Sequence, residues 1–243
     1  PLWNYTTGSI VYSVSLSADG EYIAVSDDEN VYLFDKDSST PLWNYTTGSY
    51  VWSVAISADG EYITAGSYDD KVYLFDKDSS TPLWSYTTGN YVQSVAISAD
   101  GEYIVAGGYD NKTYLFGKDS STPLWSYTTG DSVRSVAISA DGEYIAAGGA
   151  GGEVYLFDNN IPPTATIDSI TPSPARFDAE VTFSGSGSDS DGTVVAYEWS
   201  SNIDGLLSEE EDFSITGLSV GWHSITFKVQ DDDGVWSNWN NTG

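Results

Sequence analysis

The stretch Ser126–Phe157, SYTTGDSVRSVAISADGEYIAAGGAGGEVYLF, decides the fold of the first two thirds of the chain, because nearly the same sequence occurs three more times before it. Aligned on the Pro-Leu-Trp that opens each unit, the repeats begin at Pro1, Pro41, Pro82 and Pro123, which gives spacings of 40, 41 and 41 residues. A fixed period of this length is typical of solenoids and propellers.

Each unit is predicted to form four short β-strands. Residues 94–98 (SVAIS) alternate between polar and apolar side chains, a turn follows at Asp100-Gly101, and residues 103–106 (YIVA) complete an antiparallel hairpin. The Asp-Gly pair recurs in every unit because a tight hairpin needs a positive φ angle. A third run, exemplified by residues 72–75, leads into a fourth at residues 83–87. Four short strands in about forty residues predict the blade of a β-propeller.

These units resemble the WD-like and YVTN-type blades of archaeal cell-surface propellers of the S-layer type, and residues 73–86 (YLFDKDSSTPLWSY) are also similar to quinoprotein-type blades. The resemblance covers about two thirds of the chain. The Trp-Asp and Gly-His signatures of true WD repeats are absent, and Leu-Phe-Asp stands where Trp-Asp would end the third strand. The departure argues against a eukaryotic-type scaffold. We expect an all-β protein in which residues 1–160 form four propeller blades.

Composition narrows the range of partners. Thirty-six acidic residues against eight basic ones give a formal net charge of −28, which repels phosphate backbones and anionic lipids and argues against nucleic-acid and membrane-surface binding. No run approaches the length of an apolar membrane span. The chain has no Cys and no Met, so disulfides and thiol chemistry are excluded and an exposed, oxidising environment is compatible with the composition.

Four N-x-Ser/Thr sequons predict an exported glycoprotein at the cell surface. They begin at Asn4, Asn44, Asn111 and Asn240.

A second domain is predicted from residue 161 to residue 243, after the repeat stops at Asn159-Asn160-Ile161-Pro162-Pro163. Its short alternating strands, separated by Asp/Gly turns, are typical of a seven-stranded sandwich. An Asp-x-Asp-Gly turn precedes Tyr-x-Trp at residues 189–199, and Gly-x-His-x-Ile precedes a second acidic turn at residues 221–234. In these motifs the domain resembles the polycystic-kidney-disease (PKD) type of immunoglobulin-like domain. The resemblance implies an extracellular spacer or adhesion module.

The two acidic turns have two interpretations. The simpler one is turn chemistry with surface charge; the alternative is a calcium site, because hard cations prefer oxygen ligands. Its ligands would be Asp189, Asp191, Asp231 and Asp233.

Catalysis is not expected, and neither is an organic cofactor. The single His223 is predicted to lie in an alternating strand, as the structural histidine of the resembled family, so a Ser-His-Asp triad is not indicated. Quinoprotein chemistry would use a vicinal Cys pair, which the chain does not contain. A glycosidase needs two carboxylates about 5 to 10 Å apart. Among thirty-six acidic residues such pairs arise by abundance alone.

Two functions from different classes remain open. The first is a structural building block of an S-layer or extracellular filament; the second is an adhesion module that recognises a glycan or partner protein through the propeller face or the second domain. The tryptophans that open the units and the tyrosines after the Asp-Gly turns are predicted to pack between blades. Four blade-specific residues share one position, Tyr12, Trp52, Gln93 and Arg134, and are the best candidates for a differentiated surface.

Whether the propeller closes within one chain decides whether copies of the chain can associate through unpaired strands. We expect each sheet to combine strands from two successive units, so that Leu2–Thr7 is a final strand and Phe157 ends a third one. Leu2–Thr7 could pair with residues 153–158 of its own chain. The hypothesis we favour is that missing strands come from another copy or from flanking sequence, because unpaired edges template association. In the second domain, residues 236–243 stop about where the last strand of the resembled family begins.

Overall fold

The computed structural model describes residues 1–189, 192–238 and 240–242. Every regular element in these residues is a β-strand, and none of the described residues forms a helix that could span a membrane. The chain divides into two compact units, Pro1–Asn159 and Asn160–Gly243.

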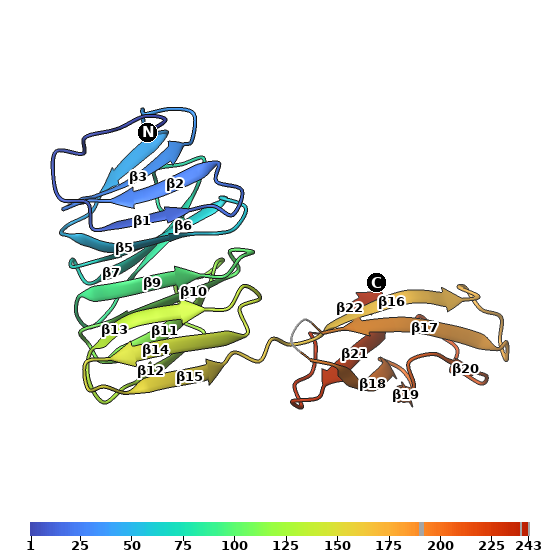
Figure 1. Cartoon of the computed structure of the whole chain (residues 1–243). Helices are drawn as coiled ribbons and strands as arrows, with labels where there is room; N and C mark the ends of the chain where they lie inside the picture. The colour runs from blue at the N-terminus through green and yellow to red at the C-terminus, as the bar shows by residue number, and fades with distance from the viewer. Residues whose placement is uncertain (190–191, 239, 243) are drawn as a thin grey trace. The chain divides into compact units, whose positions relative to one another are not determined.

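The first unit is a series of antiparallel sheets that follow one another from β1 to β15 (Figure 1). Three sheets have four strands and the last has three, so the repeats form propeller-like blades that are not closed into a ring. In sheet order the blades are β1 (Ser13–Leu16), β2 (Tyr22–Ser26), β3 (Asn30–Asp35) and β4 (Trp43–Thr46); β5 (Val51–Ile56), β6 (Tyr62–Ser67), β7 (Lys71–Asp76) and β8 (Trp84–Thr87); β9 (Val92–Ile97), β10 (Tyr103–Gly108), β11 (Lys112–Gly117) and β12 (Trp125–Thr128); and β13 (Val133–Ile138), β14 (Tyr144–Gly149) and β15 (Val154–Asp158).

The Asp-Gly turns have the predicted conformation. Gly20 adopts a φ angle of +72°, and the equivalent glycines of the other units lie between +75° and +83°. Asp19 fixes the same turn by accepting hydrogen bonds from the Ser17 hydroxyl at 2.6 Å and from the Glu21 backbone N–H at 2.9 Å. These hydrogen bonds lower the pKa of the Asp19 carboxyl, the Ser17 bond being the larger cause. Local sequence therefore sets the β1–β2 hairpin, and the repeat copies it.

Each of the three four-stranded sheets takes its fourth strand from the next repeat. In the first blade β3 pairs with β4 so that Leu33 lies opposite Trp43, and in the third blade Leu115 lies opposite Trp125 in the same way. The expectation that strands of two successive units share a sheet is confirmed. This arrangement ties neighbouring units together by backbone hydrogen bonds as well as by packing.

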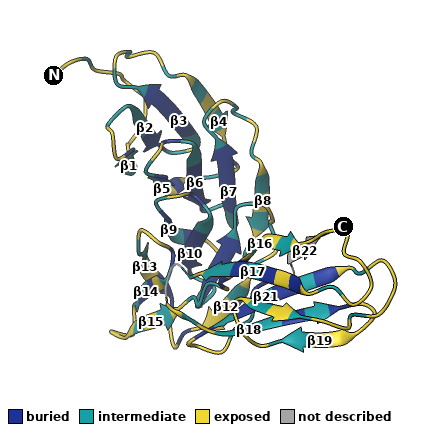
Figure 2. Ribbon diagram, turned by 90° about the vertical axis from the view of Figure 1, so that its right-hand side faces the viewer, coloured by how far each residue is buried: buried dark blue, intermediate teal, exposed yellow. Residues whose placement is uncertain are grey.

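The apolar core lies between successive blades. Val31 and Leu33 of the first blade are fully buried against Val54 and Phe75 of the second, and Figure 2 shows the third strands β3 and β7 as buried along most of their length. Trp43 packs on Phe75 with ring centroids 5.4 Å apart, and its indole N–H donates to the Lys77 carbonyl at 2.7 Å. The opening tryptophans therefore pack between blades, as the fixed spacing predicted.

The second unit contains two antiparallel sheets that share one core. One sheet has the order β16 (Thr164–Thr171), β17 (Val181–Ser188) and β20 (Phe213–Ile215); the other has the order β19 (Gly205–Ser208), β18 (Val194–Ser201), β21 (Ile225–Asp231) and β22 (Asn240–Thr242). Trp199 is fully buried and stacks on Phe227 at 4.2 Å. Since β22 pairs with β21, the expectation that the last strand is missing from residues 236–243 is wrong.

Candidate functional site

The two ends of the blade series expose side chains that the inner blades bury. On β15, at what we call the trailing end, Val154 is 82% and Leu156 is 72% exposed, whereas their equivalents in the first blade, Val31 and Leu33, are fully buried. On β1, at what we call the leading end, Val14 is 66% and Leu16 is 63% exposed. The residues that match Val14 in the other blades, Val54, Val95 and Val136, are at most 7% exposed. Each end therefore presents one half of the interface that holds the inner blades together.

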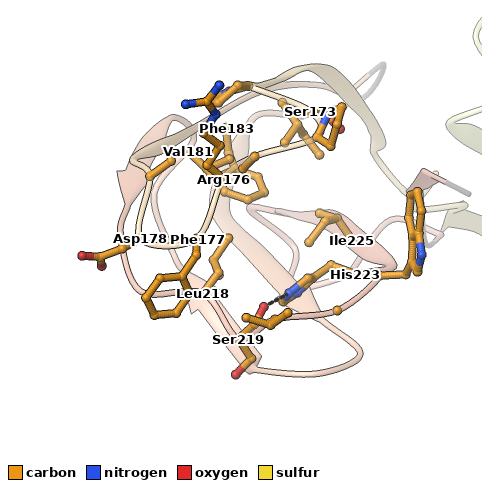
Figure 3. A pocket seen from close by; sticks show the side chains of 18 of the residues that line it. Ser173, Arg176, Phe177, Asp178, Val181, Phe183, Leu218, Ser219, His223 and Ile225 are labelled. Atoms are coloured by element: carbon orange, nitrogen blue, oxygen red, sulfur yellow. Dashed lines mark hydrogen bonds between the residues drawn. The ribbon is translucent and has the colours of Figure 1, made fainter.

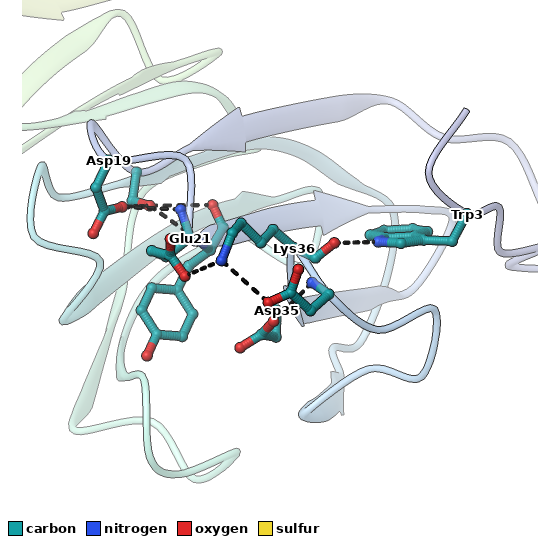
Figure 4. A network of polar contacts seen from close by, with 8 residues as sticks. Trp3, Asp19, Glu21, Asp35 and Lys36 are labelled. Atoms are coloured by element: carbon teal, nitrogen blue, oxygen red, sulfur yellow. Dashed lines mark hydrogen bonds and ion pairs between the residues drawn. The ribbon is translucent and has the colours of Figure 1, made fainter.

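Part of the leading end is covered by the segment Leu2–Thr7. Trp3 stacks on Phe34 at 5.4 Å, and its indole N–H donates to the Lys36 carbonyl at 2.6 Å (Figure 4). Tyr5 meets the edge of Phe34 at 5.1 Å. Trp43 and Tyr45 make the same contacts with Phe75 in the next blade. The segment therefore occupies the place of a fourth strand on the first blade's leading face, although it is not itself assigned as a strand.

Lys36 anchors that contact from the other side. Its ammonium group lies 2.6 Å from Glu21 and 3.2 Å from Asp37 (Figure 4). The hydrogen bond to Glu21, with a smaller contribution from Asp37, raises the pKa of Lys36. The lysine therefore stays charged and holds the loop whose carbonyl receives Trp3.

The outer edge of β15 has no neighbouring strand in the part of the chain that the structure describes. The other third strands, β3, β7 and β11, each pair with a segment of sequence Leu-Trp-x-Tyr-Thr. Leu2–Thr7 has that sequence, yet it does not pair with β15 of its own chain. The sheet that ends at β15 is one strand short, and its apolar face is uncovered.

The blade-specific position lies in a row of aromatic rings that crosses three blades. Trp52 stacks between Tyr12 at 4.8 Å and Tyr68 at 5.2 Å, and Tyr68 stacks in turn on Tyr91 at 4.5 Å. The Gln93 amide oxygen accepts a hydrogen bond from the Tyr68 hydroxyl at 3.2 Å.

Arg134 ends the same row in the fourth blade. Its guanidinium lies 4.6 Å from the centre of the Tyr109 ring and hydrogen-bonds the hydroxyl of that residue. We call this set, from Tyr12 to Arg134, the aromatic row. The sequence pattern indicated the blade-specific residues but not their partners Tyr68 and Tyr109. These two tyrosines could have been found by their repeat position, which Ala150 occupies in the fourth unit.

The predicted glycosylation sites have different settings. Asn4 is exposed in the N-terminal segment, and Asn44 is exposed on β4. Asn111 is half-buried in the turn before β11 and has a φ angle of +62°. Asn240 begins β22, where only the backbone is described.

The residues proposed to bind calcium lie at the ends of strands in the second unit. Asp189 follows β17, Asp231 ends β21, Asp233 lies in the turn after it, and Asp191 lies outside the described residues. Asp231 is 2% exposed and accepts a hydrogen bond from the Val235 N–H at 2.7 Å. Among the described residues, no group of three or more acidic or histidine side chains is arranged to hold a metal ion. Asp231 therefore makes a hydrogen bond within its turn, and the calcium site stays a prediction.

His223 lies in a loop just before β21, which corrects the prediction that it belongs to a strand. Its Nδ1 lies 2.7 Å from the Ser201 hydroxyl and 3.8 Å from Asp204, and its Nε2 lies 2.8 Å from the Ser219 carbonyl. A catalytic triad needs serine and aspartate on opposite ring nitrogens. Here both face Nδ1, and the Ser201 hydroxyl also accepts the Ile203 N–H at 3.1 Å. The histidine therefore fixes a loop.

A cavity of about 700 Å³ opens beside His223 in the second unit. Its lining includes Phe183, Leu218 and Ile225, while the charged ends of Arg176 and Asp178 point away from it (Figure 3). The cavity therefore offers mainly apolar contacts beside the His223 ring.

Comparison with known proteins places the repeats. Residues 27–160 match the family described as outer membrane protein assembly factor BamB, and residues 2–35 match the WD domain, G-beta repeat family. Among solved structures, the crystal structure of the computationally designed Ika4 protein is similar, with a TM-score of 0.54 and 13% sequence identity over 63% of this chain and 93% of that chain. At this identity the likeness concerns the fold alone. No curated protein matches the chain significantly.

Both family models describe β-propeller-like repeats, in agreement with the four successive sheets of β1 to β15. Since the first model spans more than half of the 243 residues, the chain belongs to the repeat family described as outer membrane protein assembly factor BamB.

Proposed function

We propose that the chain is a non-enzymatic structural protein of the cell surface, a building block of an S-layer or extracellular filament that assembles through the ends of its blade series. The second unit serves in this proposal as a PKD-type spacer. The observation that carries it is the exposure of Val154 and Leu156 at one end and of Val14 and Leu16 at the other. Uncovered apolar surfaces of this kind are typical of interaction sites.

Charge and composition support an extracellular setting for this assembly. The net charge of −28 keeps copies apart at low ionic strength, and the absence of Cys and Met suits an oxidising environment. In the described residues, hydrogen bonds on both ring nitrogens hold His223 in a loop, and the cavity beside it is mainly apolar, which supports a non-enzymatic role. We therefore assign the chain no catalytic activity and no organic cofactor.

The test is the mass of the purified chain in solution. Sedimentation equilibrium across a range of protein concentrations, at about 0.1 M and about 1 M salt, should show masses above the 26.2 kDa of one chain, with more assembly at high salt. A monomer at the highest concentration in both salts would overturn the proposal. Electron microscopy of the same samples then distinguishes filaments or sheets from closed rings.

A second candidate function is extracellular recognition of a glycan. The aromatic row supports it, because Trp52 is 36% exposed and Arg134 adds the charge of a cation to a strongly acidic protein. Trp52→Ala should then abolish binding on a glycan array while leaving the mass in solution unchanged. If the wild-type chain binds no glycan, this second function is excluded.

A further inference from the structure

We propose that the sheet of β13, β14 and β15 takes Leu2–Thr7 of a second copy as its fourth strand, and that this joint reproduces the interface between inner blades. The inference rests on the proposed assembly function and specifies its contacts. In the inner blades the register is constant: Leu33 lies opposite Trp43, and Asn30 lies opposite Thr46. The same register places Leu156 opposite Trp3 and Glu153 opposite Thr6 of the second copy.

The donor segment has the required sequence and position. Leu2–Thr7 reads Leu-Trp-Asn-Tyr-Thr-Thr, which is identical to Leu42–Thr47, and Trp43–Thr46 of that stretch form β4. Trp3 already makes the contacts with Phe34 and Lys36 that Trp43 makes with Phe75 and Lys77. The segment Leu2–Thr7 can therefore pair with β15 of another copy while Trp3 keeps these contacts. β4 shows the same combination, because its backbone pairs with β3 while its Trp43 packs on the next blade.

Tyrosine and glycine positions at the two ends are complementary. In the inner blades a tyrosine ring lies directly on the glycine of the next hairpin turn: Tyr62 would lie 2.4 Å from a Cβ placed on Gly101, and Tyr22 would lie 2.5 Å from one on Gly60. At the leading end Gly20 has nothing within 4 Å of such a Cβ, and at the trailing end Tyr144 is 44% exposed. The joint brings Tyr144 of one copy onto Gly20 of the next.

A glycine and a valine position at the two ends are complementary in the same way. A Cβ on Gly107 would lie 2.4 Å from Val133, and one on Gly66 would lie 2.6 Å from Val92. Gly148, the equivalent residue at the trailing end, has open space around it. Its matching valine is Val11 of the leading end, which is 47% exposed where Val92 and Val133 are at most 1% exposed. The glycine positions Gly20 and Gly148, which have no side chain over them, thus match the exposed Tyr144 and Val11 at the opposite ends.

Polar contacts between blades repeat with the same period. The Ser13 hydroxyl accepts the Val54 N–H at 3.2 Å, and the Ser94 hydroxyl accepts the Val136 N–H at 3.1 Å. Continuing the series across the joint, Ser135 accepts the N–H of Val14 in the second copy. Backbone, apolar and polar contacts all indicate one head-to-tail joint. A joint of this heterologous kind propagates or closes according to its rotation.

Disulfide trapping tests the register, since the natural chain has no cysteine. Thr6 and Glu153 are both exposed, so the double variant T6C/E153C leaves the core unchanged. The matched control T6C/D158C moves the second cysteine five residues along β15, roughly 16 Å, which is too far for a disulfide. Under mild oxidation at high salt, T6C/E153C should form covalent dimers and larger multiples on a non-reducing gel. The control should stay largely monomeric.

Four results separate this inference from the proposed function. Equal cross-linking in T6C/E153C and T6C/D158C overturns the register, and a disulfide within one monomer shows closure of the chain on itself. Assembly in solution without the T6C/E153C cross-link leaves the structural function standing and refutes strand donation. Cross-linking into closed rings in place of extended assemblies supports the joint and refutes a filament. A synthetic peptide of residues 1–9 should dissociate wild-type assemblies, and assemblies that persist at saturating peptide contradict strand donation.

Discussion

Replacing Leu156 and Leu115 by alanine separates the energetics of the exposed end from those of the inner blades. The two residues hold the same position in successive repeats, but Leu115 is fully buried and Leu156 is 72% exposed. Leu115→Ala should lower the free energy of unfolding by about 2–5 kcal/mol, through lost apolar contact and the cavity left behind. Leu156→Ala should change it by less than about 0.5 kcal/mol when the protein is dilute and monomeric.

The same substitution at Leu156 should weaken association. If the joint buries Leu156 as the inner blades bury Leu115, removing the side chain costs about 2 kcal/mol or more at the joint, roughly a 30-fold lower association constant. Urea denaturation of dilute protein measures the first quantity, and sedimentation equilibrium at high salt measures the second. Equal loss of unfolding free energy in the two variants would show that Leu156 is already covered within one chain. An unchanged association constant for Leu156→Ala would remove this face from the joint.

Three further predictions concern other parts of the chain. Gly101→Ala should destabilise the monomer more than Gly20→Ala, because both strain a positive φ angle but only Gly101 also meets a tyrosine ring, as thermal unfolding of dilute samples can measure. Burial, followed by the hydrogen bond to Asp69, raises the pKa of Tyr73. The free energy of unfolding should therefore be highest below about pH 10 and should fall as the pH rises toward the pKa of Tyr73 in the folded protein. Tyr73→Phe should make this fall shallower, as urea titrations at successive pH values can measure. Intact mass of natively sourced protein should exceed 26.2 kDa because of glycan on at least one of Asn4, Asn44 and Asn111, and a mass equal to the bare chain contradicts this.

Features that depend on local or periodic pattern were predictable from the sequence. The Asp-Gly turns have positive φ because backbone chemistry dictates it, and Trp43 packs between blades because a tryptophan at one place in every unit must meet the same neighbour. His223 was placed wrongly because His223, Ile225 and Phe227 alternate as in a strand. The strand in fact begins at Ile225, where its partner β18 ends at Ser201. The end of a strand depends on its pairing partner, which the alternation of one segment does not contain.

The candidate site was harder to predict for a related reason. Leu156 and Leu33 occupy the same position of the repeat, and their exposure differs only because a blade lies over one and not over the other. Likewise, the aromatic row joins residues about forty positions apart, and only the stacking of blades brings Trp52 onto Tyr12. Sequence therefore identified the parts of these surfaces, while their contacts depend on which repeats are neighbours.

Near-identity of the repeats has a physical consequence for assembly. Leu42–Thr47 and Leu2–Thr7 are the same peptide, so the trailing end has no chemical means of distinguishing a strand of its own chain from the strand of a second copy. The difference lies in the cost of association, about 4–15 kcal/mol of translational and rotational freedom, together with repulsion between chains that each carry a net charge of −28. The first term falls in importance as protein concentration rises, and the second falls as salt screens the charges. An inner interface is therefore permanent, whereas the proposed interface between copies should depend on protein concentration and ionic strength.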